Sequence, residues 1–434
     1  MPYGLAKRRG GNLQLGGRRG ESSVLRNFPE RHEAVELFKF HTLKHSFIKH
    51  APLGHFSFRS RNLHWTPLRS LEMPGLFDSF TLNGVTLRNR IAASPMCQYS
   101  AIDGSVTDWH LPHYTGLARG GAGLVVVEAT AVSPEGRITP GDLGLWSDTH
   151  TAGVATIAGA ISDAGAVPGI QLAHAGRKAG CTPPWEGGAP MPANDPRVWE
   201  PIAPSAVPVI PEQAHVPRAM SVKDIRRVQQ DFADAAQRAR EAGFKWIELH
   251  FAHGFLAQSF LSRHSNRRDD AYGGSLENRA RFLVETVAAV RRVWPADLPL
   301  TARLGVLEFD RQDDRNLPEA IQVLKWLKAE GLDLVDVGIG FSTLAPVPWA
   351  ANLLVETAGN VRDETGLEVT TSWLITNAKE ADSFVRKGKV AFVMLARRLL
   401  DNPHWPNTAA RELGAKTQVL PTPYAYWLQN WGPV

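Results

Sequence analysis

The chain has 434 residues, of which 43% are hydrophobic and 21% are charged. This balance is typical of globular proteins and excludes a disordered, collagen-like or fibrous chain. Two cysteines, Cys97 and Cys181, exclude a disulfide scaffold and any iron–sulfur or zinc site that needs four cysteines, so we expect a reducing, cytoplasmic environment. The longest apolar runs, such as residues 123–127, are too short to cross a bilayer, and we expect no membrane partner.

The excess positive charge lies at the N-terminus. Residues 1–70 hold 13 of the 48 Lys and Arg residues but only four of the 43 Asp and Glu residues, so the net charge of +5 comes from this segment. We predict a basic, disordered extension over residues 1–70 and one folded domain over residues 71–434. A mitochondrial transit peptide is an alternative for the extension. We expect no nucleic-acid partner, because the basic residues form an appendage with no regular period.

From Leu76 onward one theme repeats: a short apolar run, a polar loop and a longer stretch with helical periodicity. The apolar runs, each predicted to be a strand, are Arg90–Ala93, Gly123–Ala129, Val167–Ala173, Trp246–Phe251, Leu298–Gly305, Leu332–Gly340, Leu367–Ser372 and Val390–Ala396. The predicted helices are Asp108–Arg119, Ala152–Ala164, Val222–Glu241, Leu276–Val293, Leu317–Glu330, Ala351–Glu364, Ala378–Lys387 and Pro403–Leu413. Ser221 and Asp224 predict a capping box at the start of the third helix.

Continuous apolar strands that alternate with helices predict an α/β fold with a parallel sheet, and eight repeats are the number that closes a TIM (β/α)8 barrel. An open doubly wound sheet is the alternative, but no Gly-x-Gly-x-x-Gly follows the first strand. A long insertion rich in Pro and Gly, Lys178–Arg218, follows strand three. In a barrel it would overhang the carboxyl ends of the strands, so we expect a lid or pocket wall.

Polar residues follow several predicted strands. The first strand continues into SPMCQY (residues 94–99), the third contains Gln171, the fourth continues into HFAHGF (residues 250–255), the fifth contains Arg303, and Arg397 follows the eighth. The carboxyl ends of parallel strands meet at one end of a barrel. These side chains are therefore expected to form one site.

These residues lie within a set of motifs that occur in order along the chain. The motifs are SPMCQYS, DWH, GGAGLVVVEATAV, PEGR, QLAHAGRK, ELHFAHGF, LSRHSNRRDDAYGGSLENRAR and TARLG. The set resembles the Old Yellow Enzyme family of FMN-dependent ene-reductases, most closely its branch of xenobiotic reductases and thermophilic-like enzymes. The resemblance extends from about Leu76 to Trp427. It implies an FMN-binding TIM barrel that uses NADPH or NADH as reductant and forms a homodimer.

The resemblance places a flavin against the strand ends. Arg303 is a permanent cation that suits the negative charge that develops around N1 and the C2 carbonyl of a reduced flavin, and the Gln171 amide suits the pyrimidine edge. A structural ion pair inside the barrel is the alternative for Arg303. The residues that the resemblance assigns to FMN are Ser94, Pro95, Met96, Cys97, Ala129, Gln171, Arg303, Ala396 and Arg397.

His250 and His253 are predicted to donate to one carbonyl oxygen, which makes the β-carbon of an α,β-unsaturated carbonyl compound a better hydride acceptor. Zinc ligation is an alternative, but no His-Glu-x-x-His or equivalent is present, and we expect no metal. A further alternative is that the two histidines have only a structural role. The resemblance makes His250, His253, Cys97 and Tyr99 the catalytic residues. It assigns substrate binding to Tyr99, His250, His253, Phe255, Trp349 and Trp427.

Cys97 also fits a nucleophilic thiol or an inert buried thiol. The resemblance implies instead that it lies beside the flavin and tunes the flavin potential. Trp349 and Trp427 resemble the aromatic walls of the substrate pocket, although packing or subunit contacts would also explain them. Arg397 matches the arginine that binds the FMN phosphate in the family.

The chain departs from the family at three places. Ala396 replaces the glycine before the phosphate-binding arginine, and Trp373-Leu374 stands where a glycine normally follows strand seven, so close backbone approach to the phosphate is in question. Phe255 replaces the tyrosine that protonates the substrate α-carbon in relatives. A phenyl ring has no proton to give, so water, Tyr99 or another group must supply it, or acceptors that need no such proton are preferred.

We therefore expect an NAD(P)H-dependent FMN oxidoreductase that reduces electron-poor alkenes, and quinones or nitro compounds as further acceptors. One alternative is a related barrel flavoenzyme that acts on enoyl-CoA or amines, but such enzymes carry an iron–sulfur motif and an extra nucleotide domain. Another alternative is a barrel with an impaired cofactor site that acts as a binding protein.

Overall fold

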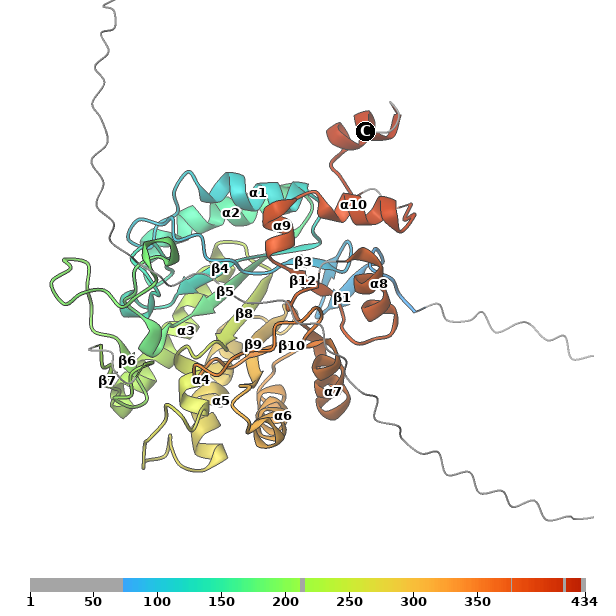
Figure 1. Ribbon diagram of the computed structural model, residues 1–434. Coiled ribbons are helices and arrows are strands. Elements are labelled where there is room, and N and C mark those ends of the chain that lie inside the picture. Colours follow the sequence, from blue (N-terminus) through green and yellow to red (C-terminus); the bar gives the residue numbers. More distant parts are fainter. Residues whose placement is uncertain (1–72, 211–214, 376, 417–418, 431–434) are drawn as a thin grey trace, which may run out of the picture. The chain divides into compact units, whose positions relative to one another are not determined.

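The computed structural model describes residues 73–210, 215–375, 377–416 and 419–430. Its centre is an eight-stranded parallel sheet in the order β11-β10-β9-β8-β5-β4-β3-β12, with the helices placed around it (Figure 1). The strands of this sheet are β3 (Ile91–Ala93), β4 (Leu124–Ala131), β5 (Val167–Ala173), β8 (Trp246–Phe251), β9 (Leu300–Leu307), β10 (Leu334–Ile339), β11 (Glu368–Thr370) and β12 (Val393–Leu395). Each of these strands lies within or overlaps one of the predicted apolar runs.

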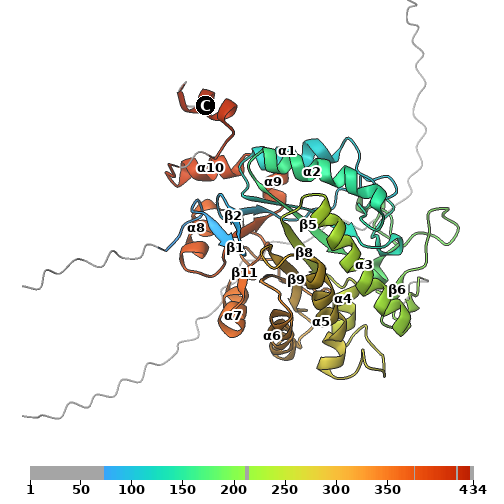
Figure 2. The same cartoon turned by 180° about the vertical axis from the view of Figure 1, so that it is seen from behind.

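The two ends of the sheet meet through hydrogen bonds between β11 and the residues that lead into β12. The backbone nitrogen of Ala391 donates to the Val369 oxygen at 2.8 Å. The Thr370 hydroxyl, which is buried, donates to the Phe392 oxygen at 2.7 Å. These bonds close the ring of strands, and the predicted (β/α)8 barrel is confirmed. The view from behind shows the same ring of helices around the strands (Figure 2).

The main helices follow the predicted alternation. They are α1 (His110–Arg119), α2 (Thr151–Asp163), α3 (Val222–Glu241), α5 (Leu276–Val293), α6 (Asp313–Ala329), α7 (Val355–Thr365), α8 (Ala378–Arg386) and α10 (Trp405–Glu412). The capping box of Ser221 and Asp224 is present at the start of α3. Helix α6 begins at Asp313 and not at Leu317. The Asp313 carboxylate accepts the backbone N–H groups of residues 308 and 309 and so holds the preceding loop against the first turn of the helix.

A short hairpin precedes the barrel and was not predicted. Strands β1 (Phe80–Leu82) and β2 (Val85–Leu87) pair across Asn83 and Gly84, both of which have positive φ, as a tight two-residue turn requires. The apolar side chains of the hairpin pack in one buried cluster with Leu124, Trp246 and Leu334, which lie at the start of their strands. The hairpin therefore covers the amino-terminal end of the barrel and leaves the other end for chemistry.

The described residues of the predicted insertion, 178–210 and 215–218, contain little regular structure. They include the two-residue strands β6 (Ile202–Ala203) and β7 (Arg218–Ala219), which pair in parallel. Helices α4 (Leu256–Leu261), α9 (Arg397–Asp401) and α11 (Thr422–Asn430) are additional to the predicted set. The predicted extension over residues 1–70 lies outside the described residues. In the described part of the chain, no helix is long and apolar enough to span a membrane.

We predict that Thr370→Val destabilises the barrel by about 1–3 kcal/mol, because the buried Phe392 carbonyl loses its hydroxyl donor while the volume of the side chain is kept. Equilibrium urea unfolding measures this loss. Thr370→Ser keeps the hydroxyl and is expected to retain most of the stability. Equal unfolding midpoints for wild type and Thr370→Val would show that this bond does not hold the ring closed.

Candidate active site at the barrel mouth

Buried polar side chains gather inside the barrel near the carboxyl ends of its strands. Arg303 on β9 donates from Nε to Asp336 Oδ2 on β10 at 2.6 Å and from Nη2 to the Ser94 hydroxyl after β3 at 2.9 Å. The Gln171 amide on β5 donates to Glu248 Oε1 on β8 at 2.6 Å, and the same oxygen lies 3.6 Å from Arg303 Nε. The structure thus brings together Ser94, Gln171 and Arg303, three residues predicted to hold the cofactor.

The charges of this group depend on one another. Burial raises the pKa of Glu248 to about 7, although Arg303 opposes the rise. Burial also raises the pKa of Asp336, again against the effect of Arg303. For Arg303, burial disfavours the charged form, but Asp336 and then Glu248 raise its pKa above the ordinary value, so the guanidinium stays charged. The barrel interior therefore holds a fixed cation between two carboxyl groups.

His250 on β8 and His253 in the following loop face each other with ring centroids 4.8 Å apart. The Ala252 backbone nitrogen donates to His250 Nδ1 at 3.3 Å, which places the proton of the neutral ring on Nε2. Burial, followed by nearby positive charge, lowers the pKa of both imidazoles well below the ordinary value, so both are neutral. The Nε2 atom of His253 is buried and has no partner among the described residues. The pair is therefore suited to bind an oxygen atom of a ligand.

The loop after β3 is held by a carboxylate from β4. Glu128 Oε2 accepts the Gln98 backbone N–H at 2.7 Å, and Oε1 accepts the Tyr114 hydroxyl at 2.8 Å. Cys97 and Tyr99 lie on either side of Gln98, so the buried carboxylate fixes the segment that carries both. Burial raises the pKa of Glu128 to about 7; hydrogen bonds from Gln98 and Tyr114 lower it, and Asp142 raises it.

Cys97 is an unfavourable nucleophile in this setting. Burial raises the pKa of its thiol well above the ordinary value, and the nearby carboxyl groups of Asp142 and Glu128 raise it further. A thiol that stays protonated at neutral pH reacts slowly. Its position in the loop beside β4, close to Tyr99, suits a residue that shapes a binding site.

Several loops at this end of the barrel contain a residue other than glycine with left-handed backbone geometry. Among them are Tyr99 after β3, His253 after β8, Phe309 after β9, Phe341 after β10 and Leu374 after β11, with φ between 50° and 61°. Such conformations cost about 1 kcal/mol or more and persist where the surroundings enforce them, as they often do at functional sites. At Leu374 the backbone adopts the conformation that glycine favours although the side chain is leucine.

Aromatic rings surround the histidine pair. The Phe255 ring lies 4.8 Å from His250, and the rings of Phe341 and Trp373 lie 5.8 Å and 5.9 Å from His253. Trp349, whose side chain is largely exposed, extends the group and lies 5.6 Å from Trp373. Phe255 and Trp349, both predicted to bind substrate, therefore belong to the same mouth as the histidines.

A cavity of about 290 Å³ adjoins this mouth. Its walls include Tyr99, Lys178 and Phe255, together with residues of the 178–218 segment such as Cys181 and Pro190. The segment therefore forms part of the wall of a cavity that Tyr99 and Phe255 also face. The volume suits a small ring compound.

The remaining predicted cofactor residues are placed as follows. Pro95 and Met96 continue the loop after β3 and are partly exposed, and Ala129 on β4 is in register with Gln171. Ala396 is partly exposed and directly precedes α9, and the side chain of Arg397, the first residue of α9, is exposed.

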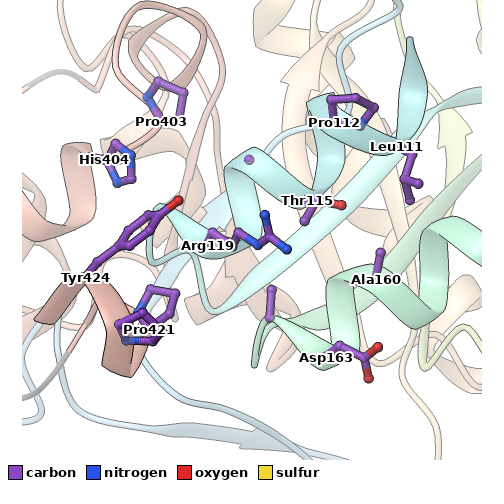
Figure 3. A pocket seen from close by; sticks show the side chains of 13 residues that line it. Leu111, Pro112, Thr115, Arg119, Ala160, Asp163, Pro403, His404, Pro421 and Tyr424 are labelled. Carbon is purple, nitrogen blue, oxygen red and sulfur yellow. The ribbon is translucent and has the colours of Figure 1, made fainter. Parts of the chain in front are cut away.

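A second and larger cavity, of about 850 Å³, is lined by residues of α1, α2 and the C-terminal segment that contains α11 (Figure 3). Thr115 and Arg119 of α1, Asp163 of α2 and Tyr424 of α11 point into it. Helix α11 also carries Trp427, which is not among the described residues that line the 290 Å³ cavity. The assignment of Trp427 to the substrate site stays a prediction.

Reasoning from the sequence missed three buried carboxylates. Glu128, Glu248 and Asp336 each stand alone within an apolar strand, in LVVVEATA, WIELHF and LVDVGI. A charged residue in an otherwise continuous apolar strand is the signal that could have identified them, because burial of a carboxylate requires partners. Lys178 was also missed, since it was read only as the start of the insertion.

Comparison with known proteins gives consistent matches. A model of the NADH:flavin oxidoreductase / NADH oxidase family matches residues 75–416. An NADPH dehydrogenase from Geobacillus thermodenitrificans is 43% identical over 345 residues, which cover 79% of this chain and 96% of that protein. The structure of morphinone reductase matches with a TM-score of 0.66 and 27% identity over 82% of this chain and 94% of its own. The structure of an Old Yellow Enzyme homologue from Zymomonas mobilis matches with a TM-score of 0.63 and 25% identity, covering 80% and 94%.

These matches define a flavin-dependent oxidoreductase built on a (β/α)8 barrel. The chain belongs to the NADH:flavin oxidoreductase / NADH oxidase family. This membership confirms the resemblance to Old Yellow Enzymes. It also confirms that the protein is an enzyme, with FMN as its cofactor and a nicotinamide nucleotide as its reductant.

The donor set at the mouth fits a flavin. Gln171 and Arg303, whose side chains both lie against Glu248 Oε1, offer an amide and a guanidinium, which match the acceptors and donors of the pyrimidine edge. Two buried ring nitrogens, His253 Nε2 and Trp373 Nε1, have no partner among the described residues. Buried polar atoms are almost always hydrogen-bonded in a functional protein, so these two point to a bound group that carries oxygen atoms.

We predict that the unfolding free energy of the wild type falls more steeply than that of Glu128→Gln as the pH rises from 4.5 to 7. The native state holds the Glu128 proton with a pKa of about 7, whereas the unfolded chain releases it near 4.5. Because the native state then binds more protons than the unfolded state, stability is lost with rising pH, by about 1.4 kcal/mol for each unit of pKa difference and about 3 kcal/mol in all. Urea unfolding at several pH values measures the slope of the unfolding free energy against pH for each protein. Other groups with shifted pKa values contribute equally to both slopes. Identical slopes would contradict the prediction.

Proposed function

We propose that this protein is an NADPH-dependent ene-reductase that reduces electron-poor alkenes, above all α,β-unsaturated carbonyl compounds. The observation that carries the proposal is the pair of neutral, buried imidazoles beside a cavity of about 290 Å³. Two neutral N–H groups that converge on one carbonyl oxygen withdraw electron density from the conjugated alkene. The relatives named NADPH dehydrogenase support NADPH as the reductant.

Bound FMN supplies hydride transfer between the nicotinamide and the substrate. The protein contributes position and charge. Gln171, Ser94 and Arg303 hold the pyrimidine edge, and the guanidinium remains cationic because Asp336 and Glu248 surround it. The full set proposed to hold FMN is Ser94, Pro95, Met96, Cys97, Ala129, Gln171, Arg303, Ala396 and Arg397.

The substrate is proposed to bind with its carbonyl oxygen between His250 and His253. Tyr99 and Phe255 face the same cavity, and Trp349 extends the aromatic wall. Quinones and nitro compounds are further acceptors, since their reduction needs no protonation at carbon. A homodimer is proposed from the family resemblance.

The test is an anaerobic titration of the purified holoenzyme with NADPH, followed by a panel of enones, quinones and nitro compounds. We expect bleaching of the flavin absorbance by NADPH and reoxidation by 2-cyclohexenone. A colourless protein that does not take up FMN would contradict the proposal and would favour a binding protein.

We predict that His253→Ala lowers kcat/KM for 2-cyclohexenone by about 100-fold, which is the usual loss when one donor to a developing oxyanion is removed. The visible flavin spectrum should be retained, because His253 is not in the group that is proposed to hold the cofactor. His404→Ala is the matched control, since His404 is exposed and lines the distant 850 Å³ cavity. Equal losses in both variants, or none in either, would remove the proposed role.

A further inference from the structure

Lys178 connects three loops at the barrel mouth by hydrogen bonds. It follows β5, and its Nζ donates to the His253 carbonyl at 2.6 Å and to the Phe341 carbonyl at 3.0 Å. Both carbonyls belong to residues with left-handed backbone geometry. A Cβ atom at Gly254 would clash with the Phe341 backbone oxygen and come within 2.8 Å of Nζ, so glycine there allows the loops after β8 and β10 to approach each other beside the ammonium. The side chain is thus held at a defined position beside the histidine pair.

Lys178 and Phe255 both line the 290 Å³ cavity. Phe255 occupies the position where relatives are expected to carry a proton-bearing hydroxyl, and it has no proton to donate. An ammonium has three N–H groups, and the two carbonyl contacts use two of them. The third can therefore be directed to a substrate in the cavity.

We propose that Lys178 is the general acid that protonates the substrate α-carbon, in place of the hydroxyl that Phe255 lacks. The inference rests on the proposed ene-reductase function and deepens it. The β-carbon receives a hydride, with its two electrons, from the nicotinamide by way of the flavin. The electron pair left on the enolate then forms the C–H bond at the α-carbon as an N–H bond of Lys178 breaks. The resulting neutral amine regains a proton from water in the cavity.

The electrostatics of the site favour this role. Burial lowers the pKa of Lys178 to about 8, and Arg177 lowers it further, whereas Glu308 and Cys181 raise it. A general acid is most effective when its pKa lies near the working pH. Tyr99, which lines the same cavity, is a weaker acid, because burial raises the pKa of its hydroxyl above the ordinary value. The charge of Lys178 contributes to the lowered pKa of His250 and His253, whose neutral imidazoles are assigned to the substrate oxygen. His215 also lines the cavity.

The first experiment follows the α-proton. The holoenzyme reduces 2-methylcyclohexenone with NADPH in D₂O, and the rate and the configuration of the deuterated α-carbon are measured. We expect a single configuration from the wild type. Lys178→Met should lower the rate about 100-fold, within the range for loss of a general acid, and should give both configurations as solvent takes over.

Two further variants separate proton delivery from loop positioning. Lys178→Arg keeps a cation that can bond both carbonyls, but its pKa is too high for it to act as an acid, so it should show the same loss. Adding Phe255→Tyr to Lys178→Met should restore the rate and the single configuration by supplying a hydroxyl. Lys245→Met, at an exposed lysine before β8, is the control and should behave as the wild type.

The outcomes are distinct. Wild-type rate and configuration in Lys178→Met would overturn the proposal, and wild-type behaviour of Lys178→Arg would show that the residue only positions the loops. The visible flavin absorbance and the urea unfolding midpoint of each variant report that it has folded and binds its cofactor. A wild type that reduces quinones but no enone would refute the proposed function independently of Lys178.

A second readout does not depend on turnover. Amino groups of the intact holoenzyme are labelled with limiting acetic anhydride at a series of pH values, and each lysine is followed by mass spectrometry. Lys178 is expected to become reactive near pH 8. A Lys178 side chain that becomes reactive only near pH 10, where an ordinary lysine does, would contradict its assignment as the acid.

Discussion

The site depends on the burial of one guanidinium, Arg303, between two carboxyl groups inside the barrel. Removal of three ionisable groups from water is costly, and a hydrophobic replacement of the same shape would often be as stable. The arrangement is therefore better explained by function than by stability. Asp336 and Glu248 keep the cation charged and fixed, and the flavin edge proposed to lie against it meets a cation that needs no reorganisation.

The loops at the carboxyl ends of the barrel strands, next to Arg303 and its two carboxyl partners, are fixed by polar side chains and not by an apolar core. Glu128 holds Gln98, and Glu308 accepts the Ser342 backbone N–H at 2.8 Å next to Phe341. Lys178 holds the loops after β8 and β10. These contacts make the strained backbone at Tyr99, His253 and Phe341 tolerable. The reactive end of the barrel is thus rigid while the aromatic rings at its rim remain partly exposed.

Most of the fold could be predicted from the sequence, because each barrel strand is a continuous apolar run and each main helix has a clear hydrophobic period. The prediction was poorer where local polar contacts hold a loop against a helix, as at Asp313, where α6 starts one turn early. The site was predictable to the extent that its residues follow strand ends, as Gln171, His250 and Arg303 do. Glu128 and Lys178 were not found, because their importance lies in partners far along the chain that a linear pattern does not show.

The placement of Lys178 explains how proton transfer is compatible with an ordered mouth. Its ammonium form has three N–H groups, and the neutral amine formed after proton transfer still has two. Two is the number needed to retain the bonds to the His253 and Phe341 carbonyls. The loops that carry the oxygen-binding histidine and the aromatic wall can therefore stay fixed in both protonation states. A tyrosine at position 255 would deliver a proton from the same loop that binds the substrate oxygen. With a lysine after β5, one loop delivers the proton and another binds the substrate oxygen, and hydrogen bonds from the lysine hold the two loops together.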